Sequence, residues 1–140
     1  MRAIAFILVG HLRHHARVLL ERYGANVTEI FDKVLALVPP ERAFALATPD
    51  YTVTPQGAAY GIPERQRGGI LHVNEILRRT AEERGVAFVS DIFEISREAG
   101  DDPTMVAQDG LHPSGAHYAR WVDAIEPVVR GMLRPQAEDA

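Results

Sequence analysis

At the centre of the chain stands Arg42-Ala43-Phe44-Ala45-Leu46-Ala47-Thr48, a short apolar run that is closed by Pro49-Asp50. Continuous apolar runs of this length are typical of strands that are buried on both faces of a parallel sheet. The residues that follow, through Gly61, are rich in Thr, Pro and Gly, which favour loops. We therefore predict a central strand that ends in a long loop.

On the carboxy-terminal side we predict a helix, a strand, a loop and a second helix. Pro63 suits the first position of a helix, and Gly85 stands where a helix C-terminal glycine belongs. The apolar face of that helix recurs at spacings of three and four, at Ile70, Val73, Ile76, Leu77 and Ala81. Residues 86–89 predict a third buried strand, and residues 90–113 predict a polar loop. Ser114 is placed to cap a final helix with the apolar face Tyr118, Trp121, Val122, Ile125, Val128, Val129 and Met132.

On the amino-terminal side, residues 3–9 form another apolar run, which Gly10 ends. From Asn26 onward apolar residues again recur at helical spacing, and Pro39-Pro40 must stop that helix. The resulting order is β-α-β-α-β-α, which predicts an α/β fold whose strands pair in parallel through right-handed crossovers. Ligands of such sheets bind beyond the carboxyl ends of the strands, where all three long loops open.

The composition excludes several classes of protein. The 140 residues suit one domain, which we place at residues 1–134, followed by a polar tail at 135–140. A net charge of −4, with 15 basic residues spread along the chain, argues against a nucleic-acid surface. The chain has no cysteine, no apolar stretch long enough to cross a bilayer and no convincing signal peptide. We therefore expect a cytoplasmic protein without disulfides or thiolate metal ligands.

The segment Asp109-Gly110-Leu111-His112-Pro113-Ser114 lies in the loop directly before the last helix. A carboxylate three residues before an imidazole, on a turn tightened by Gly110 and Pro113, can fold back to accept the Nδ1 proton. Nε2 is then left to take a proton from a serine hydroxyl. Asp109 would orient the ring, and His112 would be the base. The same four-residue pattern also occurs by chance in surface loops with a solvated histidine.

The wider context of this pair resembles a known family. Residues 85–91, the polar loop, the Asp109–His112 segment and the terminal helix resemble the last catalytic block of SGNH/GDSL-type ester hydrolases. The segments Asn74-Glu75-Ile76-Leu77 and Thr48-Pro49-Asp50-Tyr51 also look like features of that family, and the resemblance covers residues 24–133. It implies a flavodoxin-like three-layer α/β/α domain, a Ser-His-Asp mechanism acting on carboxylic esters, and no metal or organic cofactor.

The chain departs from the family's pattern at the nucleophile. Members begin with a strand that ends in a Gly-Asp-Ser block, and no such block occurs here. The serines of the chain are Ser90, Ser96 and Ser114, all toward its far end, and Ser114 is better explained as a helix cap. We therefore expect that the first strands of the family's sheet are missing from this sequence.

A second departure concerns the oxyanion donors. If Gly10 stands at the glycine of the family's Gly-x-Asn-Asp block, Leu12 occupies the asparagine position and Arg13 the aspartate position. A leucine side chain cannot donate a hydrogen bond to an oxyanion. Residues 1–22 are thus atypical. Either the chain is a decayed or truncated member, or a start-site or frame error has replaced genuine upstream sequence.

Other polar residues allow functional and structural explanations. His11, His14 and His15 suggest a metal site, but a basic, solvated first turn is the commoner explanation of such a cluster, and we expect no metal. His72 and His117 lie on predicted helices as packed or exposed side chains. Asp50, Tyr51 and Thr52 follow a strand at the active edge and fit either a pocket wall or the turn that starts the loop. Asp101 and Asp102 are better explained as a helix cap than as an acid/base pair.

The residues can be compared with the requirements of three functions. The first is an SGNH-type ester hydrolase in which His112 and Asp109 are present and the nucleophile is absent from the chain as given. The second is a non-catalytic remnant or binding module of the same fold that associates with a partner or as a homo-oligomer. The third, a phosphate binder of flavodoxin type, would need a glycine- or hydroxyl-rich loop after the first strand, and Gly10-His11-Leu12-Arg13 is neither.

Overall fold

The computed structural model describes residues 5–7 and 16–134. In chain order its strands and α-helices are β1 (Ala5–Ile7), α1 (Ala16–Leu35), β2 (Ala43–Leu46), α2 (Pro63–Glu83), β3 (Ala87–Val89), α3 (Asp91–Arg97) and α4 (Gly115–Leu133). Short 3-10 helices lie between them at Pro40–Arg42, Gly57–Tyr60, Glu98–Gly100 and Pro103–Met105. The three predicted strands are present. The β2 and β3 strands are shorter than the apolar runs that predict them, and residues 3, 4, 8 and 9 of the first run lie outside the described residues.

The strands form a parallel sheet in the order β1-β2-β3, which confirms the predicted parallel pairing. In the register of the sheet, Ala5 lies opposite Ala43, and Phe44 lies opposite Ala87. The β2 strand is therefore central and has a hydrogen-bonded neighbour on each side. All four of its residues are buried, because helices also cover both faces of the sheet at this strand.

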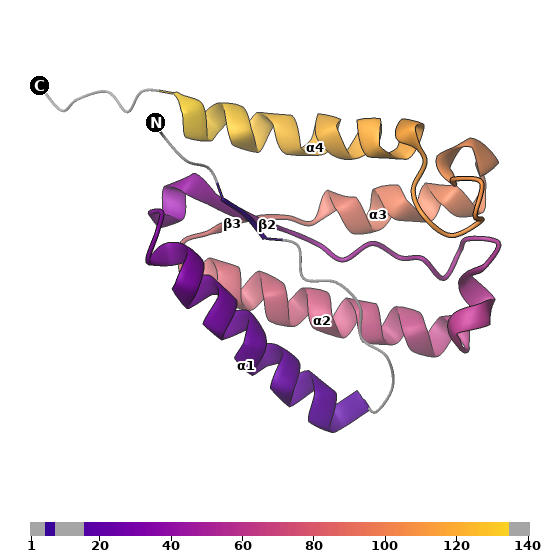
Figure 1. Ribbon diagram of the computed structural model, residues 1–140, viewed down its shortest axis with the longest axis horizontal. Coiled ribbons are helices and arrows are strands. Elements are labelled where there is room, and N and C mark those ends of the chain that lie inside the picture. The colour runs from indigo at the N-terminus through magenta and orange to yellow at the C-terminus, as the bar shows by residue number, and fades with distance from the viewer. Residues whose placement is uncertain (1–4, 8–15, 135–140) are drawn as a thin grey trace, which may run out of the picture.

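Alternate side chains of β2 pack into two separate apolar clusters. Ala43 and Ala45 join the cluster that includes residues of α1 and α2, whereas Phe44 and Leu46 join the cluster that includes residues of α3 and α4. This alternation follows from the period of two along a strand, which directs successive side chains to opposite faces. Figure 1 shows the resulting arrangement, with α1 and α2 on one side of the strands and α3 and α4 on the other.

The predicted helix boundaries are confirmed at three positions. Pro63 is the first residue of α2, and Gly85 follows the end of that helix with a φ of 69°, a left-handed conformation that favours glycine. Ser114 caps α4 by accepting a hydrogen bond from the backbone N–H of His117. A proline at the first position, a glycine after the last turn and a capping hydroxyl each act on the helix end at which they stand. These three helix ends can therefore be located from the sequence alone.

Two predictions were wrong in their extent. The first helix begins at Ala16 rather than near Asn26, and its apolar stripe continues upstream through Tyr23, which is buried. The segment 90–113 is not a simple polar loop, because it contains α3 and two 3-10 helices. Ile92 and Phe93 of α3 are buried in the core. A helix of only 7 residues is too short to display a helical period in the sequence, so the neighbouring residues Ile92 and Phe93 did not indicate a helix.

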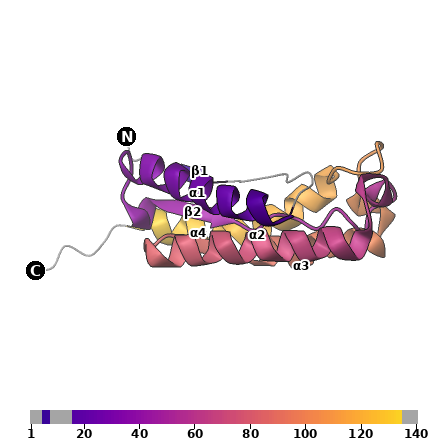
Figure 2. The same ribbon diagram turned by 90° about the horizontal axis from the view of Figure 1, so that it is seen from below.

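The loop after β2 and the loop before α4 gather at the same end of the molecule in both views (Figures 1 and 2). They are joined there by a hydrogen bond of 3.0 Å from the backbone N–H of Gln56 to the carbonyl of Gly110. This is the end at which the strands terminate, as expected for a parallel sheet. Within residues 5–7 and 16–134, no helix combines the length and apolar character needed to cross a membrane.

Candidate active site

Hydrogen bonds hold both ends of the loop before α4. Asp102 caps the 3-10 helix Pro103–Met105 by accepting from the backbone N–H of Thr104, which confirms its predicted role as a cap. Val106 and Pro113 form an isolated antiparallel bridge, and the N–H of Ala107 donates to the carbonyl of His112 at 2.8 Å. Residues 106–113 are thereby held as a compact hairpin-like turn that presents Asp109 and His112.

Gly110 is required at the tip of this turn. Its φ is 73°, in the left-handed region, and a Cβ atom built there would lie 3.0 Å from Cγ of Gln56. A side chain at this position would therefore be strained by its own backbone and crowded by the loop after β2. The glycine lets the two loops approach each other closely enough to form one site.

The Asp109 carboxylate holds the His112 ring in one orientation. Its Oδ2 lies 2.5 Å from Nδ1 of His112, while its Oδ1 accepts from the backbone N–H groups of Leu111 and His112, each at 3.0 Å. The predicted contact between the carboxylate and Nδ1 is therefore present. With Nδ1 engaged as the donor, Nε2 is the ring nitrogen left to accept a proton, as a general base requires.

Both members of the pair are largely open to solvent, because the side chain of His112 is 69% exposed and that of Asp109 is 51% exposed. The hydrogen bond from the His112 ring, which is the largest cause, and the two backbone donors together lower the pKa of the Asp109 carboxyl from its ordinary value of 3.8 to about 2. Asp109 is thus ionised at neutral pH and can stabilise a protonated imidazole.

This contact predicts how Asp109 titrates. Its ¹³C carboxyl signal should have a midpoint near pH 2 in the wild type, and His112→Ala should raise that midpoint toward 3.8 by removing the largest contribution. Because the pKa is depressed in the folded state, the pair stabilises the loop at pH values above about 4 and loses this contribution as the pH falls through about 2. His72→Ala, which removes an exposed histidine of α2, is the matched control. An unchanged midpoint in His112→Ala would contradict the assignment.

A small pocket of about 40 Å³ lies beside the pair, between the loop after β2 and the loop before α4. Its walls combine the loop after β2, part of α3, the loop before α4 and the first turn of α4. The residues that line it are Pro49, Asp50, Tyr51, Thr54, Ser96, Ala99, Met105, Val106, Leu111, His112, Pro113 and His117. The pocket places His112 and Asp50 in the wall of one cavity, although they are far apart in the sequence.

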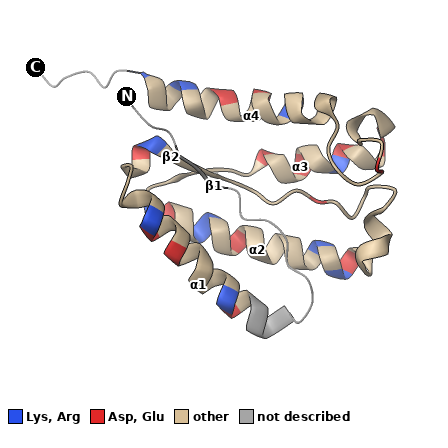
Figure 3. Ribbon diagram, in the orientation of Figure 1, with Lys and Arg blue, Asp and Glu red and all other residues tan. Residues whose placement is uncertain are grey.

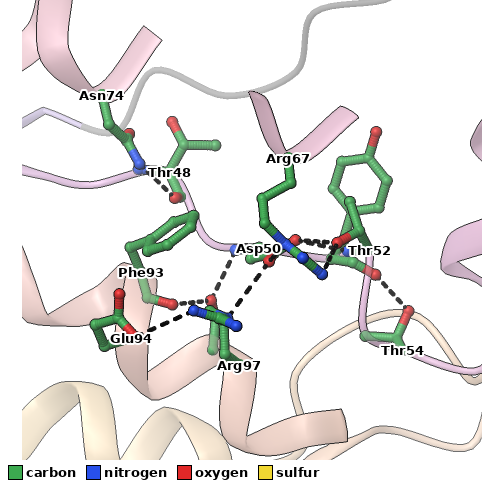
Figure 4. Close-up of polar contacts among 11 residues, drawn as sticks. Thr48, Asp50, Thr52, Thr54, Arg67, Asn74, Phe93, Glu94 and Arg97 are labelled. Carbon is green, nitrogen blue, oxygen red and sulfur yellow. Dashed lines mark hydrogen bonds and ion pairs between the residues drawn. The ribbon is translucent and has the colours of Figure 1, made fainter. Parts of the chain in front are cut away.

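Asp50 is the centre of a buried polar cluster at the end of β2 (Figure 4). Its side chain is fully buried and accepts hydrogen bonds from the N–H and the hydroxyl of Thr52 and from Nε of Arg67, the last at 2.9 Å. Nε of Arg97 lies 3.9 Å away, and the N–H of Asp50 donates to Oγ of Ser96 at 2.7 Å. Asp50 therefore forms the turn that starts the loop and also lines the pocket, so both sequence-based explanations apply.

Asn74, which lies on the same helix α2 as Arg67, holds the same strand end through the backbone of Thr48. Its Oδ1 accepts from the backbone N–H of Thr48 at 2.7 Å, and its Nδ2 donates to the carbonyl of Thr48 at 3.0 Å (Figure 4). The pairing satisfies both backbone groups of Thr48 just beyond β2, where the ladder ends. The segments that contain Thr48 and Asn74, which are 26 positions apart, are thus joined directly in space.

The serines have structural explanations at two of their three positions. Ser96 is buried and donates to the carbonyl of Phe93 at 2.6 Å, and Ser114 donates to the carbonyl of Thr104 at 2.6 Å while it caps α4. Ser90 is exposed at the start of α3 and makes no side-chain cap hydrogen bond. No hydrogen bond joins any of these hydroxyls to His112 among the described residues.

The remaining histidines divide between surface and core. His72 is exposed on α2, whereas His117 of α4 is buried. His11, His14 and His15 lie outside the described residues, as do Gly10, Leu12 and Arg13. In the part of the chain that the structure describes, no group of three or more His, Asp or Glu side chains is arranged to hold a metal ion.

Sequence and structure comparisons give no further assignment. No protein-family model, no curated protein and no solved structure matches the chain.

Proposed function

We propose that this chain is the acid–base part of an SGNH-type hydrolase of carboxylic esters, with a flavodoxin-like three-layer α/β/α domain. The observation that carries the proposal is the contact of 2.5 Å between Oδ2 of Asp109 and Nδ1 of His112. In a serine hydrolase, a carboxylate in this position fixes the tautomer and orientation of the imidazole so that Nε2 can deprotonate the nucleophile. Asp109 would be the orienting acid, and His112 the general base.

The surroundings of the pair support the same reaction class. The pair lies at the end of the molecule where the parallel strands terminate, beside a pocket with mainly apolar walls. Along the described parts of α1 and α2, Lys and Arg alternate with Asp and Glu (Figure 3), which differs from the continuous basic stripe typical of nucleic-acid binding. An ester of modest size is the substrate class that such a pocket and base would serve.

The nucleophile of the proposed reaction would come from a segment that this sequence does not contain. Ser96 and Ser114 already bond backbone groups, and the sequence holds no Gly-Asp-Ser block. In the resembling family such a block lies at the end of the first strand of the sheet. We propose that a strand of that kind would be required beside the described part of the sheet to complete the triad.

The proposal is tested by reading the DNA upstream of Met1 in all three frames and expressing the extended product. We expect a Gly-Asp-Ser block and a product whose serine is labelled by a fluorophosphonate probe. His112→Ala should abolish the labelling, and the control His72→Ala should retain it. The absence of a block from every frame, or labelling that survives His112→Ala, would overturn the proposal.

A non-catalytic binding module of the same fold is the second candidate. It is favoured by one specific observation, namely that the sequence combines an intact Asp109–His112 pair with no Gly-Asp-Ser block. On this alternative the pair serves to shape the loop before α4, and no upstream nucleophile exists. Reading the DNA upstream of Met1 also distinguishes the two functions, because only the hydrolase requires a Gly-Asp-Ser block.

A further inference from the structure

The pocket beside the Asp109–His112 pair has an open mouth and a buried floor. His112 lines the pocket, and its side chain is 69% exposed. Other residues of the lining are at most 6% exposed, namely Asp50, Ser96, Ala99, Met105 and His117. These buried residues therefore form the floor, and His112 stands at the mouth.

The polar side chains of the floor are already bonded within the protein. The Asp50 carboxylate accepts a hydrogen bond from Nε of Arg67. Oγ of Ser96 accepts from the N–H of Asp50 and donates to the carbonyl of Phe93. Nε2 of His117 is closed off, so a group in the pocket does not reach it. A polar group that entered the floor would give up hydrogen bonds to water, whereas an apolar group would not.

The size of the pocket limits that apolar group to a short one. The volume of the pocket is about 40 Å³, and one water needs roughly 10–15 Å³ of such volume, so about three non-hydrogen atoms fit. An acetyl group is of this size. Ala99 and Met105 supply apolar surface at the floor, and both are buried in the fold, so they close the pocket to a longer chain.

We propose that this pocket is the acyl subsite of the proposed hydrolase and that it selects acetyl esters over esters of larger acids. The acyl methyl group packs on Ala99 and Met105, and the ester carbonyl lies at the mouth, where His112 stands. In covalent catalysis the acyl group stays bound while the alcohol leaves, so a closed floor suits the acyl group and an open mouth suits the alcohol.

The assignment of the bound group as an acyl chain rests on the proposed function. The limit on its size is a property of the pocket, and binding measures it without turnover. The two amides N-acetylmorpholine and N-pivaloylmorpholine are suitable probes. Both keep the carbonyl group and resist hydrolysis, and their common ring is too large for the pocket, so only the acyl part can enter.

The test is an NMR titration of the 140-residue chain with ¹³C-labelled methionine methyl groups. Met105 lies in the floor of the pocket, whereas Met132 lies at the far end of α4 and is the internal control. Met105→Leu and Met132→Leu assign the two signals. N-acetylmorpholine should shift the Met105 signal in a saturable manner and leave the Met132 signal in place. N-pivaloylmorpholine should bind at least about tenfold more weakly, since one excess methylene already costs about tenfold in an apolar pocket.

Ala99→Val is the blocking variant, because the added methyl groups occupy the floor and should abolish the Met105 response. Ala119→Val makes the same change at an exposed position of α4 and should keep the response. The wild-type titration is decisive even if Ala99→Val fails to fold.

The acetyl subsite is overturned if N-acetylmorpholine does not shift Met105, if it shifts Met132 equally, or if both probes bind with equal affinity. An upstream sequence without a Gly-Asp-Ser block would instead overturn the proposed hydrolysis and leave the measured size limit standing.

Discussion

The purified 140-residue chain is expected to hydrolyse p-nitrophenyl acetate no faster than its exposed imidazoles allow. A base and its orienting acid accelerate acyl transfer only when a nucleophile lies within hydrogen-bond reach and donors await the developing oxyanion. Ser96 and Ser114 are committed to backbone contacts, and neither bonds His112. Enzymes that lose one triad member keep a rate about a thousand-fold above water only through an intact oxyanion hole and binding site.

The measurement is a comparison of initial rates for the wild type, His112→Ala and His72→Ala at equal concentration. We expect the two variants to lose similar, small fractions of an already low rate. Fluorophosphonate labelling of the wild-type chain is the more sensitive check. Labelling at Ser90, Ser96 or Ser114 that His112→Ala abolishes would show that the nucleophile lies within this chain after all.

The largest loss of stability is expected from Arg67→Ala. Nε of Arg67 donates to the fully buried carboxylate of Asp50 at 2.9 Å, and the side chain of Arg67 is itself only 32% exposed. Removing the guanidinium leaves a buried negative charge with Thr52 and the more distant Arg97 as its remaining partners. Breaking a buried ion pair in this way costs about 3 kcal/mol of unfolding free energy. Urea denaturation measures this quantity directly.

Arg65→Ala is the matched control, because Arg65 lies on the same helix and is exposed. It should change the unfolding free energy by less than about 0.5 kcal/mol. The double variant Asp50→Asn, Arg67→Ala should be more stable than the sum of the two single losses predicts, since the amide removes the unpaired charge. Equal stability of Arg67→Ala and Arg65→Ala would show that the cluster around Asp50 does not stabilise the fold.

The sequence by itself determined the elements whose cause is local. The continuous apolar run of Ala43–Leu46 and the apolar stripe of α2 are both visible in the residue order. The pair Asp109 and His112 was predictable for the same reason. His112 follows Asp109 by three positions, and Gly110 closes the turn between them, so short-range backbone geometry brings the two side chains together.

Only the tertiary structure decided which residues from distant segments meet around that pair. Arg67 reaches Asp50 from 17 positions away, and Asn74 reaches Thr48 from 26 positions away. No local pattern encodes either contact, because each depends on how α2 crosses back along the sheet. The burial of His117 against Met105 is likewise set by the packing of α4 on the loop before it. The order of residues determines the periodicity of helices and strands and the positions of turns. The partner of a buried polar group depends instead on how whole helices and strands pack together, and the spacing of residues along the chain does not specify that packing.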